Sequence, residues 1–474
     1  MFRQNPARGR ASLSGRFRAL AASSPSAPAL IEGSTGVAIS REDLVARTDT
    51  LLDELRRNDV GPGDRVGIQL PNSVDFVASF LAAEDLGCSA IPIDRDARES
   101  EVASVLHHFE VRALIYRADE PAALPRMTFR DSVPASRRGP GAPLIKLTSG
   151  STGAPRGILT AAENLIADCT SICESMGITP LDRNLGAIPF SHSYGFSNLV
   201  MPLLLQGTAI VISNDYLPLS IINLSNRYGC TVVPGIPMMF DHLAGLPKED
   251  GGFQTVRTFI SAGAPLTPQV SRRFRERFGQ PIHSFYGCSE CGGIAYDREG
   301  AAVEQGRVGT PMSGVSLSIE GETGRLVVES GAVAIGYVGG SEEELVRFQP
   351  GRFLTDDLAV IDPDESLELI GRVGDLINTA GKKVNPREVE GVLLQMEGVR
   401  QARVFGESAG ARGEVVAAVV VADLDVTRAQ IREFCRTRLS SHKVPRIVKF
   451  IESIPLDERG KFKRSALVKV VGSR

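Results

Sequence analysis

Short apolar runs alternate with stretches of helical periodicity along the first half of the chain. Residues 65–70 (RVGIQL) predict a strand and residues 73–85 a helix with apolar spacing, and two more strands and a helix follow by residue 116. Similar strand-like runs return at residues 207–212, 230–233 and 258–260. Alternation of this kind predicts right-handed βαβ units and a largely parallel sheet.

The pattern changes in the second half. Residues 308–361 show short strands and glycine turns, which predict a small β-rich unit. After residue 371, helical periodicity at residues 388–395 and 428–439 flanks a buried strand at residues 414–422. We therefore expect an α/β protein, with a large N-terminal domain of several subdomains over residues 1–371 and a small α+β domain over residues 372–474.

Composition supports a globular protein of more than one packed unit. The chain has 474 residues, of which 42% are hydrophobic and 23% charged, and its net charge is -3. This balance points to neither nucleic acid nor a membrane surface as a partner. Residues 117–143 are rich in Pro, Arg and Ala and predict a surface connection.

Targeting and redox signals favour the cytoplasm. No apolar run approaches the roughly 18 residues that span a bilayer. The chain carries no acidic residue before Glu32, as in a transit peptide, but residues 13–22 are better interpreted as an opening amphipathic helix. Seven scattered cysteines indicate reduced thiols, and the lone CxxC of Cys288 and Cys291 lacks a second ligand pair at zinc spacing. We interpret the cysteines as packing residues.

A glycine- and hydroxyl-rich segment, LTSGSTGAPRG at residues 147–157, follows an apolar strand. Glycines let backbone N–H groups approach phosphate oxygens, hydroxyls add donors, and Arg156 can grip a phosphate in bidentate fashion. The segment is not a Walker A loop. Alone, it would more often be a turn than a phosphate site. The candidate nucleotide-binding residues are Thr148, Ser149, Gly150, Ser151, Thr152, Gly153 and Arg156.

This segment closely resembles the signature of the adenylate-forming superfamily, which includes acyl-CoA synthetases, luciferases and the adenylation domains of peptide synthetases. Arg156 stands where that signature usually has lysine. Residues 284–293 (SFYGCSECGG) resemble the family's YGxTE block. The resemblance implies that Tyr286 and Gly287 lie at the adenine, that Ser289 contacts the α-phosphate, and that Glu290 holds magnesium.

Three further blocks follow the family's order. Residues 261–266 (SAGAPL) resemble the adenine wall, which implies this role for Gly263, Ala264 and Pro265. Residues 351–357 (GRFLTDD) resemble a block whose aspartate accepts the ribose hydroxyls, here Asp357, with Asp356 in place of a glycine. Residues 371–390 resemble the interdomain signature, in which Arg372 would contact ribose and Gly374 would be the hinge.

The resemblance also implies a two-step reaction. A carboxylate and MgATP would give acyl-AMP and pyrophosphate, with Glu290 on the metal and Lys461 of the C-terminal block bridging the reacting groups. The small domain would then rotate and present the adenylate to a thiol. The implied cofactors are ATP, Mg2+ and coenzyme A, or the phosphopantetheine arm of a carrier protein in place of coenzyme A.

The acid-binding residues are expected in two segments. Residues 191–197 (SHSYGFS) place His192, also a candidate catalytic residue, with Tyr194, Phe196 and Ser197 at the acyl pocket, and residues 234–239 (PGIPMM) add Gly235, Ile236 and Met238. These side chains favour an apolar or aromatic acid. No acidic residue follows Phe196 at positions 197–199, which argues against an α-amino acid.

Several alternatives remain open at this stage. A ligase that loads a carrier protein is a close rival of a coenzyme A ligase. A non-catalytic nucleotide-binding relative is a different class, suggested by the departures at Arg156, Asp356 and Gly374 and opposed by the retained Lys461 and Glu290. A luciferase-like oxidase is a remote fourth. The sequence leaves the acid, the acceptor and the oligomeric state undetermined.

Overall fold

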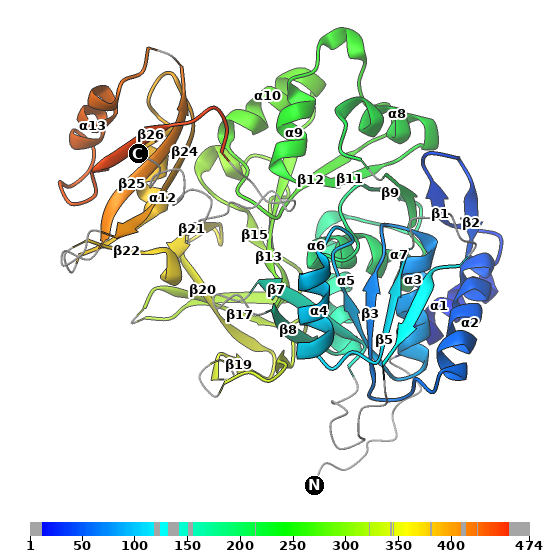
Figure 1. The fold of residues 1–474 in the computed structure, drawn as a ribbon. Helices are drawn as coiled ribbons and strands as arrows, with labels where there is room; N and C mark the ends of the chain where they lie inside the picture. The colour runs from blue at the N-terminus through cyan, green and yellow to red at the C-terminus, as the bar shows by residue number, and fades with distance from the viewer. Residues whose placement is uncertain are drawn as a thin grey trace. The chain divides into compact units, whose positions relative to one another are not determined.

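The computed structural model describes residues 12–117, 124–130, 142–149, 155–213, 215–321, 323–341, 344, 346–379, 382–408, 414–423 and 425–454 (Figure 1). The chain divides into a larger unit, Met1–Leu317 with Val328–Phe353, and a smaller unit, Ser318–Val327 with Leu354–Arg474. The division falls within the strands β16 (Val315–Ile319), β17 (Arg325–Ser330) and β20 (Arg352–Ile361).

A seven-stranded sheet forms the first layer of the larger unit. Its order is β18 (Gly336–Tyr337), β8 (Pro155–Thr160), β7 (Leu144–Ser149), β4 (Ser89–Pro92), β3 (Arg65–Gln69), β5 (Ala113–Tyr116) and β6 (Arg126–Phe129). The four strands from β7 to β5 are parallel, and the others pair antiparallel at the edges. The helices beside it are α1 (Leu13–Ser23), α2 (Arg41–Arg57), α3 (Val74–Asp85) and α4 (Glu99–His108).

A nine-stranded sheet forms the rest of the larger unit. Its order is β15 (Thr310–Pro311), β14 (Gly292–Tyr296), β13 (Ile282–Cys288), β12 (Thr258–Ser261), β11 (Val232–Gly235), β9 (Arg183–Gly186), β10 (Ala209–Ile212), β1 (Pro28–Glu32) and β2 (Ala38–Ser40). The six strands from β13 to β1 are parallel. The main helices are α5 (Ala162–Met176), α7 (Met201–Gln206), α8 (Pro218–Tyr228), α9 (Pro237–Ala244) and α10 (Pro268–Phe278).

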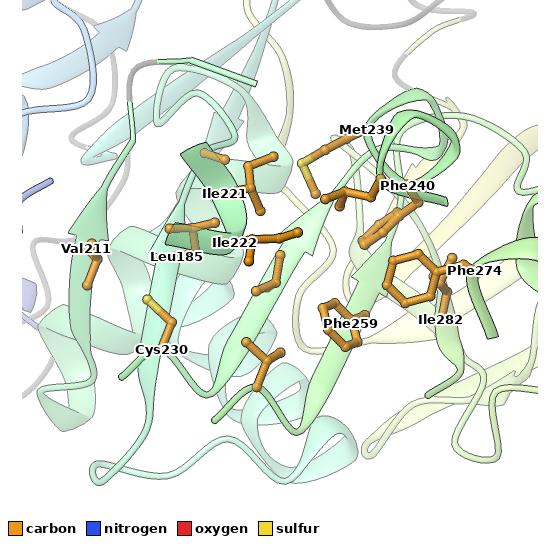
Figure 2. Close-up of a cluster of buried hydrophobic side chains, with 14 of the residues drawn as sticks. Leu185, Val211, Ile221, Ile222, Cys230, Met239, Phe240, Phe259, Phe274 and Ile282 are labelled. Carbon is orange, nitrogen blue, oxygen red and sulfur yellow. The ribbon is translucent and has the colours of Figure 1, made fainter. Parts of the chain in front are cut away.

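Aromatic side chains fill the space between the second sheet and its helices. Phe240 of α9, Phe259 of β12 and Phe274 of α10 are fully buried, and their rings point toward one another (Figure 2). The ring centroids of Phe259 and Phe274 are 4.9 Å apart at an interplanar angle of 69°, which is an edge-to-face geometry. This cluster fixes α9 and α10 over the strands whose ends carry the candidate site.

The smaller unit has a core of its own. Strands β24 (Val399–Ser408), β25 (Glu414–Ala422) and β26 (Ile447–Phe450) form a sheet, and helices α12 (Pro386–Leu393) and α13 (Arg428–Arg436) bury Leu393 and Ile431 among its valines. Capping starts both helices, because Asn385 accepts from the backbone N–H of Arg387 and Thr427 from that of Gln430. Hairpin β22 (Ile377–Thr379) and β23 (Lys382–Val384) precedes them.

The expected fold class is confirmed. The βαβ alternation gives two largely parallel sheets, and residues 308–361 are rich in strands, from β15 to β20 with β19 at Phe348–Gln349, followed by β21 (Leu367–Arg372). One expectation was too simple. The connection at residues 117–143 contains strand β6, which extends the first sheet by pairing antiparallel with β5. The phosphate segment also differs, because β7 runs on to Ser149 and β8 begins at Pro155, so both ends of the segment are strand.

A buried carboxylate links the N-terminal ends of three parallel strands, and we predict that it stabilises the fold in a pH-dependent way. The carboxylate of Asp182 accepts hydrogen bonds from the guanidinium of Arg257 at 2.7 and 3.0 Å, from the Thr231 hydroxyl at 2.7 Å and from the Thr179 N–H at 2.8 Å. Burial opposes the charge, but these partners lower the pKa of Asp182 from 3.8 to about 2. The stabilisation is therefore complete above the ordinary pKa and is lost as pH falls through the folded-state value.

Asp182→Asn should lower the free energy of unfolding by about 1–2 kcal/mol at pH 7. The check is the thermal midpoint of wild type and variant at several pH values between 7 and 3. The gap between the two proteins should narrow as the pH drops below 4. A gap that stays constant over this range would contradict the assignment.

Candidate active site

Three segments that are far apart in sequence meet at Ser289, in the turn between β13 and β14. The Oγ of Ser289 lies 2.7 Å from the Oγ of Ser193, and its carbonyl oxygen accepts from the Nζ of Lys146 at 3.4 Å. Lys146 is on β7, which leads into the glycine-rich segment, and Ser193 is in the expected acyl loop. The structure thus brings the phosphate and acyl segments to one residue.

Glu290 follows in the same turn and has two fixed contacts. The hydroxyl of Tyr337 donates to its Oε1 at 2.9 Å, and the N–H of Ala334 donates to its carbonyl oxygen at 2.8 Å. Burial and the neighbouring Glu290 raise the pKa of Tyr337 well above its usual value, so the phenol stays a donor. The carboxylate is therefore oriented before any cation arrives.

These contacts suit a magnesium ion that arrives with a nucleotide. Mg2+ in nucleotide enzymes typically takes one or two carboxylates and completes its shell with phosphate oxygens and water. Tyr337 engages one carboxylate oxygen of Glu290, and the second can ligate a cation. Over the described ranges, no group of three or more His, Cys, Asp or Glu could hold a metal.

Arg156 lies on β8 rather than in a loop. Its Nη2 is 2.6 Å from Oε1 of Glu344, and its guanidinium lies 5.5 Å from the centre of the Tyr337 ring. Both side chains of this ion pair are partly exposed. Arg156 therefore neighbours the Glu290 contact, and its Nη2 is engaged by Glu344.

His192 has a carboxylate partner that the sequence did not reveal. Its Nε2 lies 3.0 Å from Oδ2 of Asp94, and the other oxygen of Asp94 accepts from the N–H of Asp96 at 3.1 Å. An ionised carboxylate only accepts, so Nε2 carries the hydrogen and Nδ1 is the other functional atom. Asp94 lies two residues after the end of the parallel strand β4, which is where ligand-binding residues gather in α/β sheets and was the available signal.

We predict that Asp94 acts by orienting His192. Asp94→Asn keeps the shape of the side chain but removes the charge that favours one imidazole orientation. The turnover of acid-dependent pyrophosphate release should fall about tenfold while the KM for ATP stays unchanged. Asp96→Asn is the matched control, because its side chain contacts Arg95 on the surface. An equal effect of both variants would contradict a role specific to Asp94.

Tyr194 is held against strands β12 and β13 of the nine-stranded sheet. Its hydroxyl donates to the carbonyl oxygen of Ile260 at 3.0 Å, and its ring centre lies 5.7 Å from that of Phe285. Burial raises the pKa of Tyr194 well above its usual range, so it remains neutral. The hydroxyl of Tyr194 is therefore fixed by Ile260, and its ring adds apolar surface beside Phe285.

Phe196 and Ser197 are buried in a π-helical turn, Phe196–Val200. The ring of Phe196 packs edge-to-face on Phe80 at 4.9 Å, and the Ser197 hydroxyl donates to Oδ2 of Asp168 at 2.6 Å. Asp168 also accepts from the N–H of Gly293 at 2.9 Å and is 2% exposed. Asp168, on α5, therefore connects the acyl loop to β14. The spacing of these residues in the sequence could not show this connection.

The remaining pocket candidates lie at the end of β11 and the start of α9. Gly235 is the last residue of β11, where a Cβ would come within 1.9 Å of the terminal methyl of Met239, so a larger residue would require the Met239 side chain to move. Ile236 caps α9 and Met238 is exposed on its first turn. Gly263 has φ +85°, which favours glycine, and a Cβ there would lie 3.6 Å from Ile236. The adenine-wall and acyl candidates are therefore neighbours.

The other nucleotide candidates of the larger unit lie beside these. Tyr286 is half-buried near the end of β13, and Gly287 is exposed. Ala264 is half-buried and Pro265 exposed after β12. Thr148 lies in β7, whereas Ser149 is described only as the last residue of that strand. Gly150, Ser151, Thr152 and Gly153 lie outside the described residues.

The smaller unit holds the ribose and hinge candidates. Asp357 of β20 pairs in register with Arg372 of β21, and Nε of Arg372 lies 2.7 Å from Oδ1 of Asp357. Asp356 instead forms an ion pair with Arg325, whose Nη2 lies 3.1 Å from its Oδ1. Gly374 lies in a single 3-10 turn, and a Cβ there would meet open space. Lys461 lies outside the described residues.

No helix in the described part of the chain is long and apolar enough to cross a lipid bilayer. The two-sheet fold with a smaller second unit, and a turn that joins phosphate, metal and acyl candidates, define the class of AMP-forming, acid-activating ligases. The chain belongs to the family described as AMP-binding enzyme, whose pattern matches residues 17–338, and the family's C-terminal domain pattern matches residues 388–461. The membership in the adenylate-forming superfamily and the enzyme class predicted from the sequence are confirmed.

Relatives and solved structures agree with this membership. The chain is 28% identical over 468 residues to a feruloyl-CoA synthase of an Amycolatopsis species, covering 92% of this chain and 94% of that protein. It is 26% identical over 487 residues to the long-chain-fatty-acid–CoA ligase FadD13 of Mycobacterium tuberculosis, covering 95% and 97%. The ATP-bound crystal structure of MatB from Rhodopseudomonas palustris superposes with a TM-score of 0.85 at 25% identity, covering 97% and 98%.

Proposed function

We propose that this protein activates an apolar or aromatic carboxylic acid with MgATP and transfers the acyl group from acyl-AMP to coenzyme A. The observation that carries the proposal is the convergence at Ser289, whose hydroxyl and carbonyl contact Ser193 and Lys146. An acid and a triphosphate must meet within about 3.5 Å to react, so segments that bind them must share one wall. Ser289 is that shared point.

Each candidate residue has a role in the first step. Glu290 holds the magnesium ion between the phosphates, and Ser289 and Arg156 bind phosphate oxygens. The region of residues 148–153 supplies backbone N–H groups, and Lys461 neutralises charge that moves to the leaving pyrophosphate. His192 borders the acid in the acyl loop, and Asp94 fixes the orientation of its imidazole. Tyr286 and residues 263–265 border adenine, and Asp357 with Arg372 binds ribose.

The chemistry of the acid follows from the side chains near Tyr194. Phe285 adds apolar surface, and the phenol is neutral and already bonded to Ile260. An aromatic or aliphatic acid fits such a wall better than a charged one. The named relatives act on ferulic acid and long-chain fatty acids, and both use coenzyme A. We therefore favour coenzyme A over the phosphopantetheine arm of a carrier protein, and we place the enzyme in the cytoplasm.

Pyrophosphate release across a panel of acids tests the proposal. The panel contains cinnamic-type, benzoic and medium- to long-chain fatty acids, with an amino acid as the negative member, and thioester is measured with coenzyme A or a carrier protein. We expect release with an aryl or fatty acid and thioester on coenzyme A. Release without any thioester would reject the second step, and thioester on the carrier alone would favour the rival acceptor. Absence of release with every acid would favour a non-catalytic relative.

A domain rotation about Gly374 is the second part of the proposal, with domains at residues 1–371 and 372–474. The open space around Gly374 allows a side chain, so Gly374→Ala should retain both half-reactions. Gly374→Pro restricts φ and should lower thioester formation about tenfold or more while acyl-AMP formation persists. Single-turnover measurements of each half-reaction provide the test. Equal behaviour of the two variants would contradict a hinge at this residue.

A further inference from the structure

Two cysteine thiols flank the turn that carries Ser289 and Glu290. Cys288 is the last residue of β13, Cys291 is the last residue before β14, and their Sγ atoms are 3.1 Å apart. Both are free thiols in this structure. The ends of a turn lie within about 7 Å of each other, which overlaps the Cα separation that a disulfide needs. A shift of about 1 Å in the turn and its two cysteine side chains would therefore bring the sulfurs to bonding distance.

The exposure of the two thiols differs in a way that suits stepwise oxidation. All seven cysteines lie in the described part of the chain, and Cys288 is the one that is not buried. The Sγ of Cys291 lies 3.1 Å from that of Cys288 and is buried. An external reagent therefore meets Cys288 first, and Cys291 is positioned to attack from inside.

We propose that Cys288 and Cys291 are a reversible dithiol–disulfide site that controls acyl-AMP formation, with a low-molecular-weight disulfide as the oxidant. The Cys288 thiolate attacks one sulfur of the oxidant, forming a mixed disulfide and expelling one thiolate. That thiolate takes the proton of Cys291, whose sulfur then attacks the sulfur of Cys288 and expels the second thiolate, which takes up the proton that Cys288 had released to solvent. The protein loses two protons and two electrons, and the oxidant becomes two thiols.

The disulfide would alter the turn that lies between the two cysteines. Closing the gap to about 2.05 Å moves the sulfurs together by about 1 Å. Ser289 and Glu290 have partners outside the turn, Ser193 and Tyr337, so they cannot follow this movement without breaking a contact. Misplacement by about 1 Å costs up to about a hundredfold in rate, so oxidation should lower acyl-AMP formation by roughly tenfold or more. This consequence rests on the proposed function, whereas disulfide formation does not.

The first arm of the test measures the bond itself. The full-length reduced protein is incubated with oxidised glutathione, its remaining thiols are alkylated, and peptides are mapped by mass spectrometry. We expect the peptide containing residues 288–291 to be unalkylated and lighter by two hydrogens. Alkylation of both cysteines, or a stable glutathione adduct on Cys288, would overturn the proposal. Cys169 and Cys173 serve as the internal comparison, because their Sγ atoms are 3.9 Å apart but both are buried in α5.

The second arm measures pyrophosphate release before and after oxidation and again after dithiothreitol. We expect oxidation to lower pyrophosphate release roughly tenfold or more, and dithiothreitol to restore it. Oxidation should have no such effect on Cys288→Ser or Cys291→Ala. It should have the full effect on a Cys169→Ala/Cys173→Ala variant. Disulfide formation with unchanged release would overturn the control of activity and leave the proposed function intact. Reduced wild type that never releases pyrophosphate would instead contradict the proposed function, while the mass measurement still decides whether the bond forms.

Discussion

Glu290→Gln should lower acid-dependent pyrophosphate release by roughly a hundredfold or more at saturating ATP. Glutamine keeps the length of the side chain and can still accept the hydrogen bond from Tyr337, which lies 2.9 Å from Oε1. The variant therefore loses the negative charge while the turn keeps its contact. A magnesium ion bound with the nucleotide would then lack the carboxylate of Glu290, and a higher concentration of the metal should be needed for half-maximal activity.

The matched control for this prediction is Tyr337→Phe. It removes one hydrogen bond to Glu290 but retains the carboxylate, so release should fall by about tenfold or less with little change in the magnesium dependence. Titrating Mg2+ in each variant separates loss of metal binding from loss of orientation. Activity of Glu290→Gln within threefold of wild type at all magnesium concentrations would remove Glu290 from the metal site.

The segments of the site could be predicted from the sequence, but the contacts that hold them could not. Glycine-, hydroxyl- and charge-bearing residues are local patterns, so Ser289, Glu290 and the acyl loop were found from the chain alone. The partners Asp94, Tyr337 and Asp168 come from other elements, and each looks ordinary within its own segment. Only the folded sheets bring them within hydrogen-bonding distance.

The same distinction applies to the fold. Periodicity identified α3 and β3, because a helix or strand that buries one or both faces records its period in its apolar residues. It missed β6 (RMTF), an edge strand whose alternating exposure leaves half its side chains polar in a Pro- and Arg-rich segment. It also placed Arg156 in a loop, whereas β8 pairs with β7 as far as Ser149. A glycine-rich sequence predicts a turn, but it does not show at which residue the hydrogen-bonded pairing of the two flanking strands ends.

The acyl loop shows why a local motif can be insufficient for substrate choice. The absence of an acidic residue at positions 197–199 argued against an amino acid, yet Asp168 reaches Ser197 from α5. That carboxylate is 2% exposed and already accepts from Ser197 and Gly293, so it cannot also pair with a substrate amine without losing those bonds. The argument for an apolar or aromatic acid therefore stands on the burial of Asp168 as well as on the sequence.

Lys461→Ala should lower acyl-AMP formation by roughly a hundredfold to a thousandfold and leave the reaction of supplied acyl-AMP with coenzyme A within threefold of wild type. The first step moves negative charge onto pyrophosphate and gains from an ammonium group, whereas attack by a thiol on the adenylate needs no cation at the phosphates that have left. Separate measurements of pyrophosphate release and of thioester formation from synthetic acyl-AMP give the two rates.

Lys463→Ala is the matched control for charge, because it removes the same group two residues away. It should retain both half-reactions, and Lys461→Arg should recover part of the first, since the positive charge is kept but its geometry changes. Loss of both half-reactions to the same extent in Lys461→Ala would mean that the residue supports the fold or nucleotide binding in general. A selective loss of the first step would show that the C-terminal segment enters the site only while the acid is being activated, which is the behaviour that a rotating domain requires.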